Sequence, residues 1–90
     1  MALLRIPNTL RPLAGGAAEI GVAAEDLGAA IRAVAAEHPD LADRIIDESG
    51  RLYGFVNVFV GEAECRTLDG LETSLGPDSV VSVVPAVAGG

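Results

Sequence analysis

The sequence predicts an α+β fold, in which a mixed sheet of four to five strands packs on one main helix. Two observations lead to this prediction. Apolar residues alternate in short segments towards both ends of the chain, and they recur with helical spacing between these segments. An initial strand pair, one amphipathic helix and further strands produce a sheet that covers the helix. In these 90 residues we expect one domain over residues 1–84 and a flexible tail over residues 85–90.

The N-terminal part predicts a strand pair. Residues 2–7 predict a first strand with Leu4 and Ile6 on one face, because alternate residues of a strand point the same way. Residues 8–16, which contain a proline and paired glycines, predict a turn region. Residues 17–23 alternate again and predict the second strand of a hairpin.

The clearest helix comes next. Its apolar stripe follows i, i+3, i+4, i+7 and i+8 spacing and consists of Leu27, Ala30, Ile31, Val34 and Ala35. Glu25 and Asp26 precede the stripe, where acidic residues favour the positive end of the helix dipole. His38 stands before Pro39, which disfavours the helical conformation at His38 and ends the helix. A second, short helical segment is expected over residues 40–46.

The second half of the chain predicts the remaining strands. Residues 55–60 are rich in β-branched and aromatic residues and give the strongest strand pattern. Residues 61–64 predict a turn, and residues 65–66 a short return strand. Residues 68–75 predict a loop with a helical turn, and residues 80–84 the final strand.

Composition and charge exclude several functions. The formal net charge is −7, and a negative field repels nucleic acid but favours docking on a basic protein surface. All six basic residues are arginines, so the chain offers no lysine as an acceptor for an isopeptide bond. No segment has the pattern of a signal peptide or of a membrane span. We therefore expect a cytoplasmic protein without a nucleic-acid or membrane partner.

The C-terminal segment has the most distinctive composition in the chain. It holds only small or apolar residues: Pro85, Ala86, Val87, Ala88, Gly89 and Gly90. Proline ends the strand ladder, and glycines allow the backbone to pass through a narrow channel. The one reactive group of this arm is the α-carboxylate of Gly90. The arm has the shape needed by an enzyme that brings a protein carboxylate to ATP; a frayed terminus without a role is the alternative.

Three stretches carry a family resemblance: Ile6-Pro7-Asn8-Thr9-Leu10-Arg11, residues 55–60 and residues 85–90. With them the chain resembles the MoaD/ThiS family of ubiquitin-like sulfur carriers, and within it most closely the CysO type of actinobacteria. The resemblance spans essentially the whole chain and implies a β-grasp (ubiquitin-like) fold. Residues 61–64, Gly-Glu-Ala-Glu, depart from the Asn-Asp/Gly-Glu-Asp often found in this family, which affects the expected turn type only.

The resemblance also implies a function. An E1-like activating enzyme of the MoeB/MoeZ type would adenylate the Gly90 carboxylate with ATP, while residues 85–89 thread into that enzyme. Sulfur would then displace AMP and leave a thiocarboxylate at Gly90. The protein would be a cosubstrate rather than an enzyme, with no catalytic residue, metal or cofactor of its own. We expect the sulfur acceptor to be a cysteine synthase-like enzyme, the large subunit of molybdopterin synthase, or a thiazole or thiosugar synthase-like enzyme.

A partner must also recognise the domain. Asn57 indicates the solvated face of its strand, so Phe55 and Phe59 are expected on that outer face. With Val84 and Ser82 they form a candidate partner patch. The alternative is that one or both phenylalanines belong to the core.

The sequence is also compatible with other functions. The chain can be a ubiquitin-like modifier joined to another protein's lysine, the small subunit of molybdopterin synthase, or a binding domain with an incidental tail. Cys65 is the only cysteine, so no internal disulfide can form. Glu64 beside it favours a raised thiol pKa and an inert cysteine. His38 has no second ligand at metal-binding spacing.

Overall fold

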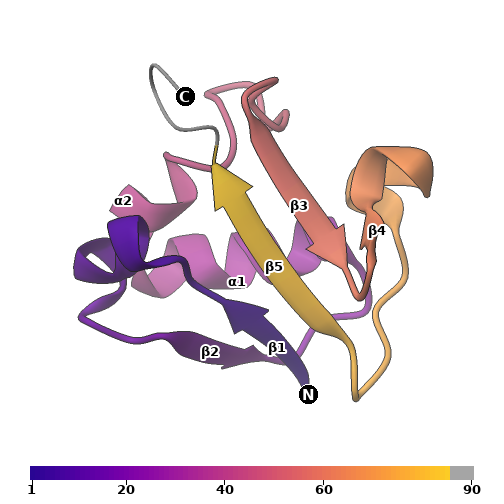
Figure 1. Cartoon of the computed structure of the whole chain (residues 1–90), viewed down its shortest axis with the longest axis horizontal. Helices are drawn as coiled ribbons and strands as arrows, with labels where there is room; N and C mark the ends of the chain where they lie inside the picture. Colours follow the sequence, from indigo (N-terminus) through magenta and orange to yellow (C-terminus); the bar gives the residue numbers. More distant parts are fainter. Residues whose placement is uncertain (86–90) are drawn as a thin grey trace.

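Five strands form one mixed sheet with α1 lying across one of its faces (Figure 1). The computed structural model describes residues 1–85. In chain order the elements are β1 (Ala2–Arg5), the 3-10 helix η1 (Asn8–Ala14), β2 (Glu19–Val22), α1 (Leu27–Glu37), α2 (Pro39–Ala42), β3 (Val56–Val60), β4 (Ala63–Glu64), the 3-10 helices η2 (Cys65–Thr67) and η3 (Gly70–Glu72), and β5 (Val80–Pro85). The predicted α+β class is confirmed.

The strands lie in the order β2-β1-β5-β3-β4. β1 pairs with β2 in an antiparallel hairpin, as predicted, and with β5 in parallel. β3 pairs antiparallel with both β5 and β4. The last strand of the chain therefore runs through the middle of the sheet, and its C-terminal end lies between the end of β1 and the start of β3 (Figure 1).

The core lies between the sheet and α1. Leu4, Val58 and Val81 come from three neighbouring strands, and each is at most 1% exposed. The helical stripe meets them with Leu27, Ala30, Ile31 and Val34, all buried, while Ala35 is half-buried. Full burial of a valine, leucine or isoleucine side chain in this core stabilises the fold by roughly 1.5–3 kcal/mol.

The N-terminus of α1 is capped by the residue that the sequence places there. The Asp26 side chain accepts a hydrogen bond from the Ala29 amide at 2.7 Å. Such a cap contributes about 1 kcal/mol because it satisfies an amide that has no partner within the helix. Pro39 begins α2, which ends at Ala42 and is shorter than the expected segment over residues 40–46.

Residues 8–16 are a correction to the predicted turn region, because η1 occupies most of them. Leu10 and Ala14 are buried and fix one side of η1 against the core. Arg11 donates from Nε to the Ile6 carbonyl at 3.0 Å, and from Nη1 to the Asn8 side chain. These contacts give a structural reason for the Ile6-to-Arg11 motif.

The return strand is a second correction. It lies at Ala63–Glu64, two residues earlier than predicted, and Cys65 and Arg66 belong to η2. Gly61 has a φ of +64°, which allows a tight turn that brings Ala63 opposite Val60. The Glu64 side chain then accepts from the Arg66 amide at 3.0 Å and caps η2.

The ends of β3 and β5 also differ from the prediction. β3 starts at Val56, because Phe55 belongs to a turn closed by a hydrogen bond from the Val56 amide to the Tyr53 carbonyl at 3.1 Å. β5 continues through Pro85, which lies opposite Val56. The Val56 amide donates within the turn, so this last pair does not depend on the N–H that proline lacks.

The predicted tail residues Ala86, Val87, Ala88, Gly89 and Gly90 lie outside the described residues. None of the helices within residues 1–85 is long and apolar enough to cross a membrane.

Candidate functional site: the outer sheet face and the end of β5

The face of the sheet opposite α1 carries the residues that alternate with the core positions. The strand register brings together Leu3 from β1, Asn57 and Phe59 from β3, and Val80, Ser82 and Val84 from β5. All six are half-buried or exposed. An ion pair borders each side of this outer face: Arg5 with Glu19 at 3.5 Å, and Arg66 with Glu64 at 3.1 Å.

The candidate partner patch lies at the surface. Phe55 is 58% exposed and Val84 45% exposed, and both are among the few large apolar side chains at the surface of the described residues. Phe59 is half-buried and lies opposite Ser82 on the outer face, so neither phenylalanine belongs to the buried core. A partner's binding to this patch stays a prediction.

Phe55 lies beside the place where the described chain ends. Val84 is opposite Asn57 and Pro85 is opposite Val56, the residue that follows Phe55. Residues 53–55 and the end of β5 therefore share one end of the sheet (Figure 1). We call residues 53–55, together with Val84 and Pro85 at the end of β5, the root of the tail.

An aromatic pair at the root was not predicted from the sequence. The rings of Tyr53 and Phe55 stack with centroids 4.9 Å apart and planes at 16°. Tyr53 packs against the core while Phe55 is exposed, so the pair connects the interior to the surface. Two aromatics separated by Gly54 before a strand are the only sequence signal for such a stack.

Arg66 connects this turn to β4. Its Nη2 donates to the Tyr53 carbonyl at 2.7 Å, and its Nη1 donates to Glu64 Oε2 at 3.1 Å. The same Glu64 oxygen also accepts from the Val58 amide at 3.4 Å. Burial alone would raise the pKa of Glu64, but the hydrogen bonds from Arg66, Cys65 and Val58 and the Arg66 charge together lower it. We call Glu64, Arg66 and the Tyr53 carbonyl the arginine clip.

Cys65 is fully buried, as the sequence predicts for an inert thiol. Burial first, and then the Glu64 carboxylate 3.5 Å from its Sγ, together raise the pKa of the Cys65 thiol to about 11. Within residues 1–85, no three His, Cys, Asp or Glu side chains lie together in a way that could hold a metal ion.

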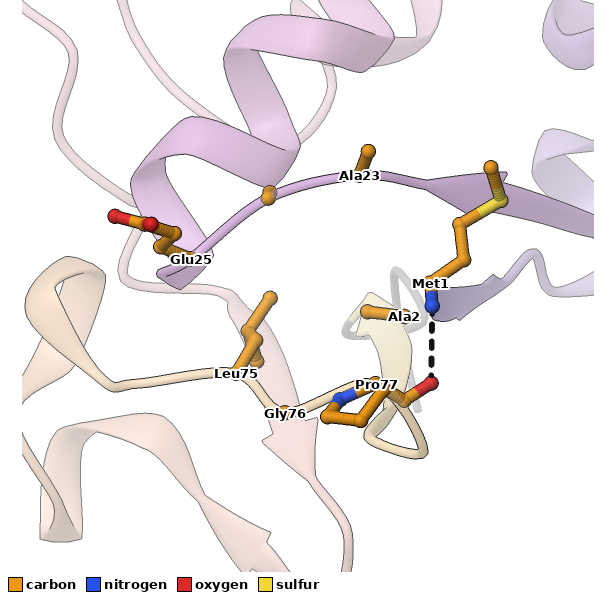
Figure 2. Close-up of a pocket in the computed structure, with 8 residues that line it drawn as sticks. Met1, Ala2, Ala23, Glu25, Leu75, Gly76 and Pro77 are labelled. Carbon is orange, nitrogen blue, oxygen red and sulfur yellow. Dashed lines mark hydrogen bonds between the residues drawn. The ribbon is translucent and has the colours of Figure 1, made fainter.

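Figure 2 shows a hollow lined by residues 1–2, 23–25 and 75–77. The Met1 amine donates to the Pro77 carbonyl across it at 3.2 Å. These segments adjoin the beginnings of β1 and β5, whereas the candidate patch and the root lie towards the end of β5. The hollow is therefore separate from the candidate partner patch and from the root of the tail.

A five-stranded mixed sheet with a central parallel pair and one long helix across it defines a β-grasp, ubiquitin-like protein. The model of the ThiS family matches residues 4–90, so the chain belongs to this family.

Curated relatives and solved structures agree with this assignment. The sulfur carrier proteins CysO of Mycobacterium tuberculosis and Mycobacterium bovis are 37% identical to the chain over 87 residues, which cover 94% of each protein. The crystal structure of M. tuberculosis CysO is similar with a TM-score of 0.88 and 32% identity, over 97% of this chain and 100% of that one.

Two further structures widen the comparison. A chain of the Amycolatopsis orientalis BexX/CysO complex matches with a TM-score of 0.92 and 29% identity over the full length of both chains. The small archaeal modifier protein 1 of Methanosarcina acetivorans matches with a TM-score of 0.84 and 26% identity, over 99% of this chain and 95% of that one.

Proposed function

We propose that this protein is a sulfur carrier, loaded as a thiocarboxylate at Gly90. The observation that carries the proposal is the similarity to the CysO proteins, which are described as sulfur carriers and are 37% identical over 94% of the chain. The family match continues to residue 90 and therefore includes the Gly89-Gly90 pair.

The chemistry needs an activating enzyme. A carboxylate is a poor electrophile at neutral pH. Its attack on the α-phosphorus of ATP releases pyrophosphate and makes a mixed anhydride with a good leaving group. Sulfide then attacks the Gly90 carbonyl carbon and displaces AMP, which leaves the thiocarboxylate. A persulfide donor instead gives an acyl disulfide with loss of AMP, and a thiol must reduce its S–S bond to release the thiocarboxylate. The enzyme supplies ATP binding and catalysis, and this chain supplies the carboxylate as a cosubstrate.

The proposed partners are an E1-like enzyme of the MoeB/MoeZ type and a sulfur-accepting synthase. Similarity to CysO favours a cysteine synthase-like acceptor that works on O-phosphoserine. The BexX/CysO complex supports the view that a carrier of this shape assembles with a second protein. A thiosugar synthase-like enzyme is a further candidate acceptor. A molybdopterin or thiazole synthase is an alternative acceptor, and incubation of the thiocarboxylate form with each purified synthase tests which of them takes the sulfur. We propose that this sulfur transfer takes place in the cytoplasm.

The adenylation step is tested by ATP–pyrophosphate exchange with the E1-like enzyme of the same organism. We expect exchange that depends on the carrier, and its loss when Gly90 is deleted. Gly90 has no side chain to anchor it, so the deletion should leave the thermal midpoint unchanged. Absence of exchange, while M. tuberculosis CysO with its own enzyme is active in parallel, would contradict the proposal.

Similarity to a small archaeal modifier protein favours one other function, covalent attachment to lysines of other proteins. That function predicts conjugates of higher mass in a lysate supplied with ATP. The chain has no lysine of its own, so it would cap an acceptor lysine and could not be extended through its own side chains. Conjugates that form without any thiocarboxylate would favour this second function.

A further inference from the structure

The length of chain after Pro85 limits where an activating enzyme can bind. Five residues follow Pro85, and a fully extended chain spans at most about 3.6 Å per residue, or about 18 Å in all. The shortest principal extent of the protein is 25 Å. An enzyme that acts on the Gly90 carboxylate must therefore lie against the end of the domain that carries the root.

An exposed aromatic ring lies at the end of the domain that carries the root. Four large apolar residues of the described chain are exposed, and two of them, Phe55 and Val84, lie at the root. Met1, another of the four, lies towards the opposite end of β5. Aromatic side chains that become desolvated at the centre of an interface account for much of its binding energy. The net charge of −7 steers the domain towards a basic surface, whereas Phe55 supplies a local apolar contact.

The turn that carries Phe55 is held by hydrogen bonds rather than by packing at its tip. A Cβ built on Gly54 would meet no atom within 4 Å, so the space on that side of the backbone is open. The Tyr53 amide donates to the Ile45 carbonyl at 3.2 Å. The Tyr53 carbonyl accepts from the Val56 amide at 3.1 Å and from Arg66 at 2.7 Å. Because Arg66 is charged, it makes the strongest of these bonds.

We propose that the stacked Tyr53–Phe55 pair is the contact by which an apolar surface of the activating enzyme recognises the root of the tail. In this proposal Arg66 is the positioning residue that holds the pair through the Tyr53 carbonyl. The inference rests on the proposed function, because it concerns how the carrier meets the enzyme that activates Gly90. It adds the arginine clip, whose residues are not part of the candidate partner patch.

Kinetics of ATP–pyrophosphate exchange test the contact itself. With the E1-like enzyme of the same organism, Phe55→Ala should raise the KM for the carrier about tenfold and leave kcat unchanged. Phe55 is exposed, so this variant should fold. Exchange with the wild-type chain tests the proposed function, and an unchanged KM for Phe55→Ala would overturn this inference while leaving the function intact.

Arg66→Met tests the positioning role. We expect a rise in KM of several-fold without a change in kcat, together with loss of the upfield ring-current shift of the Tyr53 ring protons in NMR. Arg66→Lys keeps the charge and can pair with Glu64, but lacks the fork that also reaches Tyr53, so its KM should stay raised. Arg32→Met removes the same charge from an exposed position of α1 and should leave KM unchanged.

The double variant separates positioning from a direct contact by Arg66. If Arg66 acts through Phe55, Arg66→Met in the Phe55→Ala background should add little to KM, because the positioned ring is already gone. Multiplication of the two single effects would contradict the positioning role. So would an Arg66→Met variant whose KM rises while the Tyr53 ring-current shift is retained.

Discussion

Glu64 and Cys65 are neighbours in the chain, and their side chains make stability depend on pH in opposite ranges. The Glu64 carboxylate is held ionised by the arginine clip, and its pKa is lowered. The Cys65 thiol is held neutral by burial, and its pKa is raised to about 11. Each shift favours one protonation state of the folded protein, so each gives a testable dependence on pH.

We predict that Cys65 is unreactive in the folded protein and destabilising at alkaline pH. Its pKa is raised on folding, so its contribution is fully present below the unfolded value, near 9, and is lost as the pH rises towards about 11. Urea unfolding at pH 8 and pH 10.5 should show a larger loss in the wild type than in Cys65→Ala. A thiol reagent that modifies Cys65 at pH 8 without denaturant would contradict the buried, neutral thiol.

The arginine clip should respond to acid. Because folding lowers the pKa of Glu64, its contribution is present above the unfolded value of about 4.5 and is lost as the pH falls through the folded value. Asp47 has a lowered pKa as well, mainly through the hydrogen bond from the Arg51 amide, so the wild type loses stability at both residues. We expect Glu64→Gln to lose less unfolding free energy than the wild type between pH 6 and pH 3. Equal losses would show that the clip does not stabilise the fold.

At the scale of elements, the pattern of residues predicted what is local and missed what is long-range. The alternation in β1 and the stripe of α1 gave their buried faces correctly, because these patterns repeat within each element. The 3-10 helix η1 is an exception: it lies where the sequence predicts a turn, and its contacts from Arg11 to Ile6 and Asn8 are local, but no apolar periodicity marks it.

The root of the tail shows the same limit. The sequence alone identifies the Gly89-Gly90 ending but does not predict the arginine clip. Arg66 is 13 residues from Tyr53 in the chain and meets it only because β4 folds back beside β3. No local spacing encodes such a contact.

The outer face of β3 offers a prediction at this scale. Phe59 is half-buried there, so it contributes less than a fully buried phenylalanine would. Phe59→Ser should therefore lower the unfolding free energy by only about 1 kcal/mol and leave the protein folded. The KM for the carrier in ATP–pyrophosphate exchange should rise, because the candidate partner patch loses an aromatic ring. Val58→Ser, at a fully buried position of the same strand, is the control and should destabilise strongly. If Phe59→Ser unfolds in the same way, Phe59 acts as a core residue.

At the scale of the whole molecule, the residues that stabilise the fold are distinct from the segment that we propose to carry sulfur. The core between the sheet and α1 is apolar, and the buried side-chain nitrogens and oxygens of the described residues all have hydrogen-bond partners. The sheet brings the end of β5 to one end of the domain, beside Phe55. The described part of the chain thus ends next to an exposed aromatic ring, on a protein whose net charge of −7 favours a basic partner.

The mass of the C-terminal peptide tests the central claim most directly. The purified chain is incubated with the E1-like enzyme, ATP and sulfide, and the C-terminal peptide is examined by mass spectrometry. We predict the exchange of one oxygen for one sulfur at Gly90, dependent on ATP and absent after deletion of Gly90. An unchanged C-terminal carboxylate, under conditions that load M. tuberculosis CysO with its own enzyme, would contradict the assignment as a sulfur carrier.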